Sequence, residues 1–348
     1  MQALLWPALV VCAISSAETG GIKPEPRACR TEFTYKASVK DLPAGTKALV
    51  MWVPIPSNSE WQNVESVEID GLSGHKITQE RKYGNRMVYV SVASPQTPLA
   101  LTVRFVVSRK EVRVLASDTT RPTPAPVGAS SLRENLKSET RLPTGGRYDT
   151  IAREVTASKS TTMEKARAIF NHVVDTVQYD YKQESPKYGE GDSDFVCDYK
   201  KGDCTDIHSY MISLMRSVGI PIVHEFGLPL GGIPLPDPMP TDTKITSYHC
   251  YACFYDPAYG WIPADASDAR RWIDHNRPEM RDYLFGNLVL ERNGVAISRG
   301  RNLILAPPQK GEPLNKFIYP YAEADGKAIK VDLDLTRRTL GSPSNTAH

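Results

Sequence analysis

The stretch YKKGDCTDIHSYMISLMRSVGIP, Tyr199–Pro221, decides how the rest of this sequence is interpreted. Its apolar side chains recur at the three- and four-residue spacing of a helix that packs on a core: Ile207, Met211, Leu214, Met215 and Val218. Gly219 and Pro221 then act as helix stop signals. The spacing therefore predicts a helix that begins near Cys204 and places this cysteine in its first turn.

The predicted position gives Cys204 unusual chemistry. The first turn of a helix has unpaired backbone N–H groups and the positive end of the helix dipole, and both favour an anion. The pKa of the Cys204 thiol is therefore expected to fall below its ordinary value. A merely structural cysteine gains nothing from this placement, so the pattern favours a nucleophile.

Length, charge and composition limit the class of protein. The chain has 348 residues, a formal net charge of +2, 41% hydrophobic residues and 27 prolines, which suits two or three globular domains with an ample core. No charge asymmetry indicates a nucleic-acid or membrane-surface partner. We therefore expect neither nucleic-acid binding nor a stable membrane span.

The first twenty residues, MQALLWPALVVCAISSAETG, have the pattern of an export signal. An uncharged apolar run of about a dozen residues ends in small residues, which predicts a signal peptide at 1–17 and a mature protein in the periplasm or outside the cell. The run is too short to span a bilayer. Cys12 lies in a segment similar to a lipoprotein processing site, but Val11 replaces the usual small residue, which disfavours lipid anchoring.

Export would change how the cysteines pair. Removal of the signal peptide leaves five of them: Cys29, Cys197, Cys204, Cys250 and Cys253. An oxidising compartment would tend to pair four and leave one free, with a connectivity that the sequence does not define. We expect Cys204 to be the free one.

The pattern along the chain predicts several regions. Residues 30–115 alternate apolar and polar side chains, as in FTYKASV and LALTVRFVV, at intervals typical of a β-sandwich domain. A Pro-rich connector follows at 116–146. Residues 147–285 combine amphipathic helices with aromatic strands and form the predicted catalytic core, and 286–348 form a β-rich extension and tail.

A nucleophilic cysteine needs a base, and His249 is the first candidate. It lies in SYHCYACFYDPAYGWIPADAS, which predicts two aromatic strands joined by a turn at 256–260. If Tyr255 pairs with Trp261, His249 and Asp265 become diagonal neighbours on one face, about 7–8 Å apart at the backbone. Imidazole and carboxylate then meet, which supplies the base and its orienting group for thiolate attack on an amide carbonyl.

Two alternatives remain open for these residues. His208 follows Cys204 by four residues on the same helical face and is a second candidate base, although Asp206 points elsewhere and leaves it without a partner that fixes its tautomer. The other alternative is zinc bound by Cys204, His208, Cys250 and Cys253. Strand geometry places Cys250 and Cys253 on opposite faces, about 10 Å apart, so they cannot bridge each other and zinc is disfavoured. We expect no metal and no cofactor.

Three segments resemble the signature segments of the transglutaminase-like superfamily, a papain-like cysteine fold: GDCTDIHSYMISLMRSVGIP, SYHCYACFY and YGWIPADASDA. The segments MWVPIPSNSEWQNV and FIYPYAEADG are similar to flanking segments of exported bacterial members. The resemblance implies an α+β fold, in which a helix bearing Cys204 packs on an antiparallel sheet beside the N-terminal β-sandwich domain. It also implies that Cys204 is the nucleophile, His249 the base and Asp265 its orienter.

The same resemblance implies a side-chain donor that completes an oxyanion hole beside the Cys204 backbone N–H. Tyr179 and Tyr181 are weak candidates, because a tyrosine hydroxyl can donate to an oxyanion. Packing at the end of the preceding helix accounts for both tyrosines equally well.

The expected reaction is acyl transfer on peptide or isopeptide amides through a thioester. Hydrolysis by a protease or amidase is favoured, since nothing resembles a calcium loop with dense acidic ligands. Amine transfer by a protein-glutamine transglutaminase remains open, as does a non-catalytic peptide-binding scaffold of the cell envelope. The expected partner is a protein or peptide substrate, including one in the cell envelope.

Overall fold

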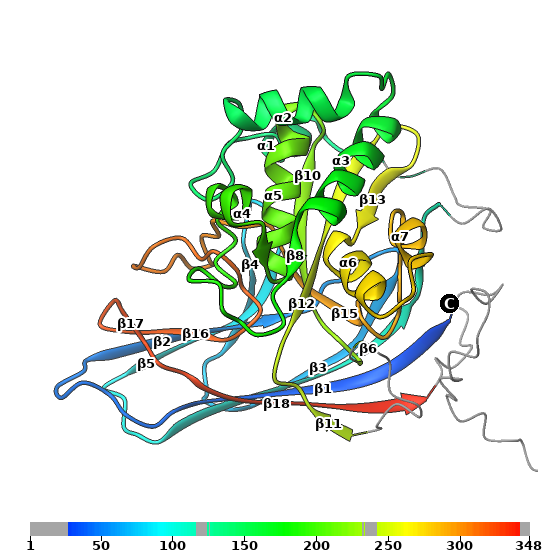
Figure 1. Ribbon diagram of the computed structural model, residues 1–348. Helices are drawn as coiled ribbons and strands as arrows, with labels where there is room; N and C mark the ends of the chain where they lie inside the picture. The colour runs from blue at the N-terminus through cyan, green and yellow to red at the C-terminus, as the bar shows by residue number, and fades with distance from the viewer. Residues whose placement is uncertain (1–26, 116–123, 125, 232, 234–241, 342–348) are drawn as a thin grey trace, which may run out of the picture.

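The computed structural model describes residues 27–115, 124, 126–231, 233 and 242–341. The predicted signal peptide and the end of the tail lie outside the described residues. The fold is α+β, as predicted: Figure 1 shows the helices gathered on one side of the molecule and the longest strands running beneath them. No helix within the described ranges is long and apolar enough to cross a bilayer.

Two five-stranded antiparallel sheets form the β-sandwich. The first has the order β11-β18-β1-β6-β3, with β11 at Asp242–Lys244, β18 at Asp332–Gly341, β1 at Ala28–Val39, β6 at Leu99–Lys110 and β3 at Gln62–Gly71. The second has the order β17-β16-β2-β5-β4, with β17 at Lys327–Ile329, β16 at Tyr321–Ala324, β2 at Ala48–Ile55, β5 at Arg86–Ala93 and β4 at Lys76–Gln79.

The alternating pattern of the first strand has the expected effect on packing. Phe33, Tyr35, Ala37 and Val39 are all buried on one face of β1. Side chains of both sheets share one core, because each sheet turns its apolar face inward. The strands β16, β17 and β18 complete the two sheets, so the strands of residues 30–115 do not form them alone. The domain boundaries read from the sequence stay predictions.

A third antiparallel sheet supports the helices. Its order is β13-β12-β10-β15, with β13 at Gly260–Ala264, β12 at His249–Asp256, β10 at Ile222–Leu228 and β15 at Val295–Arg299. The helices are α1 (Ala129–Glu134), α2 (Arg147–Thr156), α3 (Thr162–Thr176), α4 (Ser193–Tyr199), α5 (Cys204–Ser217), α6 (Ala266–Asp274) and α7 (Met280–Tyr283). Short strand pairs join β7 (Val112–Arg113) to β14 (Asn287–Leu288) and β8 (Gln178–Tyr179) to β9 (Lys201–Gly202).

Helix α5 is the centre of this half of the molecule. Its residues from Cys204 to Arg216 are all buried, between helices and the third sheet. Asp203 and Asp206 form a capping box at its start, and Gly219, with φ of 78°, follows its end. The helix predicted from the opening stretch is therefore confirmed, and its start is fixed at Cys204.

Candidate active site

Cys204 lines a cavity of about 620 Å³. It is the first residue of α5, and its side chain is only 4% exposed. The residues around it include Tyr179, Asp203 and His249. A thiol at a helix N-terminus thus meets a cavity large enough to admit a peptide side chain.

The structure brings His249 and Asp265 together. The Nε2 atom of His249 lies 2.7 Å from Oδ2 of Asp265. The predicted strand register is confirmed, since Tyr255 pairs with Trp261. Strand β13 ends at Ala264, and Asp265 is the N-cap of α6.

The cap position fixes the carboxylate of Asp265. Its Oδ1 atom accepts hydrogen bonds from the backbone N–H of Asp268 at 2.9 Å and from the hydroxyl of Ser267 at 3.1 Å. Asp265 therefore contacts His249 through Nε2, which leaves the Nδ1 atom of this histidine available to another partner.

A second carboxylate, which the sequence analysis missed, lies beside the same histidine. The Oδ2 atom of Asp268 is 3.5 Å from Nε2 of His249, and Arg292 binds Asp268 through Nε at 2.8 Å and Nη2 at 3.1 Å. The sequence signal was available, because Asp268 follows Asp265 by one helical turn in DASDA. No comparable sequence pattern pointed to Arg292.

The surroundings displace Cys204 and His249 toward their charged forms. A hydrogen bond from Cys250, together with His249 and His208, holds the pKa of Cys204 well below its ordinary value against the effect of burial. Burial alone would lower the pKa of His249, but the carboxylates of Asp268 and Asp265 raise it to about 9. A thiolate beside an imidazolium is therefore the favoured state.

His208 has a partner that the sequence analysis did not foresee. Its Nε2 atom lies 3.5 Å from Oδ1 of Asp265, and its Nδ1 atom lies 3.8 Å from Sγ of Cys250. The expectation that His208 lacks a fixing partner is therefore wrong. Asp206 does point elsewhere, toward the backbone N–H groups of Gly189 and Gly191. The shorter contact to Asp265 favours His249 as the base.

The cysteines are not paired as expected. No disulfide joins any two of the five cysteines of the described residues: Cys29, Cys197, Cys204, Cys250 and Cys253. Cys250 faces Thr205 of α5, whereas Cys253, three residues further along β12, lines a different cavity. The four-residue zinc set considered above therefore does not gather at one point.

The two tyrosines proposed for the oxyanion hole occupy different positions. Tyr179 lines the cavity beside Cys204 and lies under the guanidinium of Arg271, 4.8 Å from its ring centre. Tyr181 is 50% exposed and donates a hydrogen bond to Asp274 at 3.1 Å. Tyr181 also lines the cavity, so both tyrosines stay predictions as oxyanion donors.

Three further tyrosines of the cavity were missed: Tyr188, Tyr248 and Tyr319. The hydroxyl of Tyr248 lies 2.5 Å from the hydroxyl of Thr205 and accepts from Lys316 at 2.9 Å. The position of Tyr248 directly before His249 was a usable signal. Tyr188 lies in a loop whose path the sequence pattern does not define.

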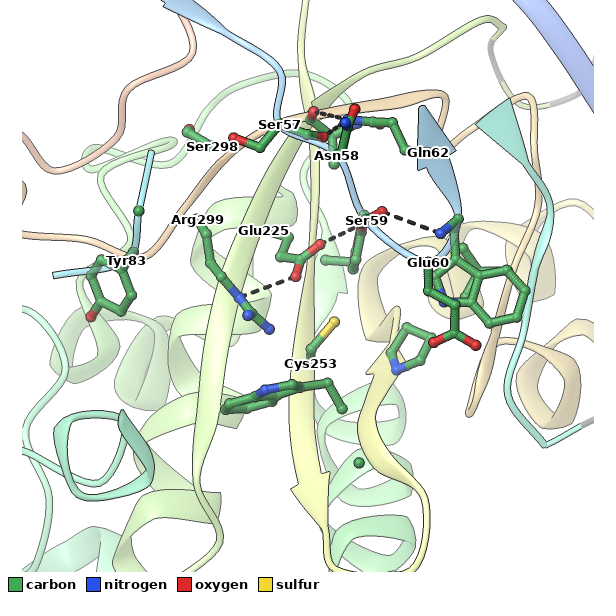
Figure 2. Close-up of a pocket in the computed structure, with 18 of the residues that line it drawn as sticks. Ser57, Asn58, Ser59, Glu60, Gln62, Tyr83, Glu225, Cys253, Ser298 and Arg299 are labelled. Atoms are coloured by element: carbon green, nitrogen blue, oxygen red, sulfur yellow. Dashed lines mark hydrogen bonds and ion pairs between the residues drawn. The ribbon is translucent and has the colours of Figure 1, made fainter. Parts of the chain in front are cut away.

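A second cavity, of about 480 Å³, lies around Cys253 (Figure 2). Figure 2 shows Glu225, Arg299 and Cys253 around it, and Glu225 is 3.2 Å from Nε of Arg299. The hydroxyl of Tyr251 also donates to Glu225 at 2.9 Å. None of its described lining residues is a histidine, so this cavity offers the cysteine no imidazole base.

Comparison with known proteins agrees with this geometry. Residues 149–266 match the model of the Transglutaminase-like superfamily. An uncharacterized protein of Haemophilus influenzae is 26% identical over 326 residues, which cover 86% of each chain.

Two solved structures are similar to this chain. One from Cytophaga hutchinsonii, described as a "Putative Cysteine Protease", has a TM-score of 0.55, 13% identity and coverage of 91% of this chain and 92% of the other. The periplasmic domain of TgpA from Pseudomonas aeruginosa has a TM-score of 0.35 and 15% identity, over 70% of this chain and 76% of that domain. The first of these supports the fold, which joins a sandwich to a papain-like core.

Proposed function

Because residues 149–266 form a transglutaminase-like core, we propose that this chain catalyses cysteine-dependent acyl transfer on peptide or isopeptide amides. Cys204 is the nucleophile, His249 the general base and acid, and Asp265 the residue that orients His249. The observation that carries the proposal is the 2.7 Å contact between His249 and Asp265 beside a cysteine at a helix N-terminus.

The geometry supports a complete reaction cycle. The thiolate of Cys204 adds to the amide carbon, and the N–H groups of the first turn of α5 stabilise the oxyanion. His249 then gives its proton to the leaving amine, which leaves a thioester on Cys204. A water molecule that His249 activates attacks the thioester and releases the acid.

No segment of the sequence resembles a calcium loop with dense acidic ligands, which favours water over an amine as the final acceptor. We therefore propose a protease or amidase in preference to a protein-glutamine transglutaminase.

The proposal is tested with a peptide library that contains internal and isopeptide-linked glutamines and lysines. The purified mature protein is incubated with the library in heavy-oxygen water and a fluorescent primary amine. Hydrolysis predicts heavy oxygen in new carboxyl groups and no amine incorporation, and the Cys204→Ala protein serves as control. Incorporation of the amine would identify a transglutaminase. Peptide binding with neither product would identify the cell-envelope scaffold.

Export to the periplasm or beyond is part of the proposal. It is supported by the apolar N-terminal segment and the small residues before Glu18. Cell fractionation, with the N-terminal sequence of the mature protein, tests it. Recovery of the protein in the cytoplasm with Met1 in place would refute it.

A further inference from the structure

Three side chains of the transition-metal-binding kind meet behind Cys204. They are His208 of α5, His224 of β10 and Cys250 of β12, and each is at least 99% buried. One donor atom of each lies within 4.8 Å of those of the other two. The 3.8 Å between Nδ1 of His208 and Sγ of Cys250 suits two ligands of one ion, given metal–nitrogen and metal–sulfur bonds of about 2.0–2.3 Å.

His224 supplies an independent observation. Neither its Nδ1 nor its Nε2 atom has a hydrogen-bond partner among the described residues, although the side chain is fully buried. A buried polar group without a partner costs stability, and native proteins rarely contain one without a reason. A metal ion bound at this ring would remove the cost.

A carboxylate lies beside His208, as is common for a histidine that binds a metal ion. A ligating histidine usually gives its other ring N–H to a carboxylate, and Nε2 of His208 lies 3.5 Å from Oδ1 of Asp265. A metal ion on Nδ1 requires the ring proton to be on Nε2. The contact in which the Ser267 backbone N–H donates to Nε2, also 3.5 Å, forms only in the other tautomer, with the proton on Nδ1.

We propose that His208, His224 and Cys250 bind one d¹⁰ metal ion, Zn²⁺ or Cu⁺. A set of two imidazoles and one thiolate suits these ions and does not suit Mg²⁺ or Ca²⁺, which require oxygen ligands. Binding converts the Cys250 thiol into a metal-bound thiolate and releases one proton to solvent.

Metal binding is tested first without any activity assay. The full mature chain is stripped with a chelator, reduced, and titrated with Co²⁺ as a spectroscopic probe. The proposal predicts one equivalent, a thiolate-to-cobalt charge-transfer band and the visible bands of a low-coordinate site, all displaced by Zn²⁺. Titration with Cu⁺ in a competing chelator distinguishes the two d¹⁰ ions. Failure of Co²⁺, Zn²⁺ and Cu⁺ to bind in this way overturns the proposal.

Variants locate the site. His224→Leu keeps a similar volume and breaks no hydrogen bond, so it should unfold at the same temperature or higher and lose at least about 100-fold in affinity, since even outer-shell changes cost 10–100-fold. Cys253→Ala, on the opposite face of β12, is the matched control and should bind as the original does. Cys204→Ala should also retain binding. Loss of binding in Cys204→Ala, or its retention in His224→Leu, would contradict the assignment.

Discussion

Two cavities of comparable size each contain a buried cysteine, but only one contains the parts of a nucleophile. The cavity around Cys204 measures about 620 Å³ and has His249 in its wall. The cavity around Cys253 measures about 480 Å³ and has Glu225 and Arg299 instead. Strand β12 contributes to both, because it runs between them.

The comparison shows that surroundings decide the state of a thiol. Burial and the carboxylate of Glu225 raise the pKa of Cys253 well above its ordinary value. Cys204 is equally buried, yet hydrogen bonds from Cys250 and His249 lower its pKa well below the ordinary value. At Cys204, a hydrogen-bond donor and a cation lower the thiol pKa by more than desolvation raises it. At Cys253, the carboxylate acceptor and desolvation both raise the thiol pKa.

The largest expected effect comes from exchanging the two cysteines separately for alanine. Cys204→Ala should reduce turnover by about 10⁴-fold or more, because it removes the atom that forms the thioester. Cys253→Ala should change turnover by less than about 2-fold, since Cys253 lies in a cavity without a histidine and its thiol pKa is raised. Equal losses in both variants, measured as kcat/KM on one peptide, would show that the two cavities act as one site.

The next effect ranks the histidines. His249→Ala should cost about 10³-fold or more in kcat, and Asp265→Ala about ten-fold less than that, because Asp265 only orients and stabilises the imidazole. His208→Ala should cost no more than about ten-fold, since its contact to Asp265 is the longer one at 3.5 Å. Circular dichroism of each variant checks folding. A larger loss of kcat for His208→Ala than for His249→Ala would show that His208 is the base.

Local patterns predicted the parts of the site that depend on neighbouring residues. The helix at Cys204 follows from a three- and four-residue period, and the meeting of His249 with Asp265 follows from one hairpin register. Both depend on fewer than about thirty residues of chain, over which spacing translates directly into geometry.

Long-range pairing was not predictable in the same way. His224 comes from β10, and its position near Cys250 requires the alignment of β10 with β12, which are separated by twenty residues along the chain. The completion of the sandwich by β16 and β18 joins residues about 300 apart, as in the pairing of Thr31 with Thr339. The alternation of apolar and polar residues gives each strand a buried face but does not determine which strand pairs with it.

Cysteine pairing failed for a related reason. The expectation rested on a compartment and an odd number of thiols, not on where they lie. In the structure the five cysteines are buried as single packing or hydrogen-bonding groups, and none bridges another.

A smaller effect concerns the pH dependence of alkylation. Iodoacetamide reacts with the thiolate, and the pKa of Cys204 is lowered while that of Cys253 is raised. At mildly acidic pH, Cys204 should therefore be labelled at least ten-fold faster than Cys253. His249→Ala should slow the labelling, because it removes the cation that stabilises the thiolate. Peptide mapping by mass spectrometry identifies the labelled residue. Labelling of Cys204 only at alkaline pH, independent of His249, would favour the scaffold.

The smallest effect should appear in stability alone. Cys253 is 6% exposed, and its thiol donates to Glu225, which also accepts from Tyr251 at 2.9 Å. Cys253→Ala removes a buried sulfur and one weak donor while Glu225 keeps its other partners, so the free energy of unfolding should fall by about 1 kcal/mol. Urea denaturation measures the change, and the unaltered slope of the transition checks that folding remains two-state. Because β12 is also the strand of His249, a loss of turnover beyond about 2-fold in this variant would mean that repacking around Cys253 reaches the catalytic face through the strand.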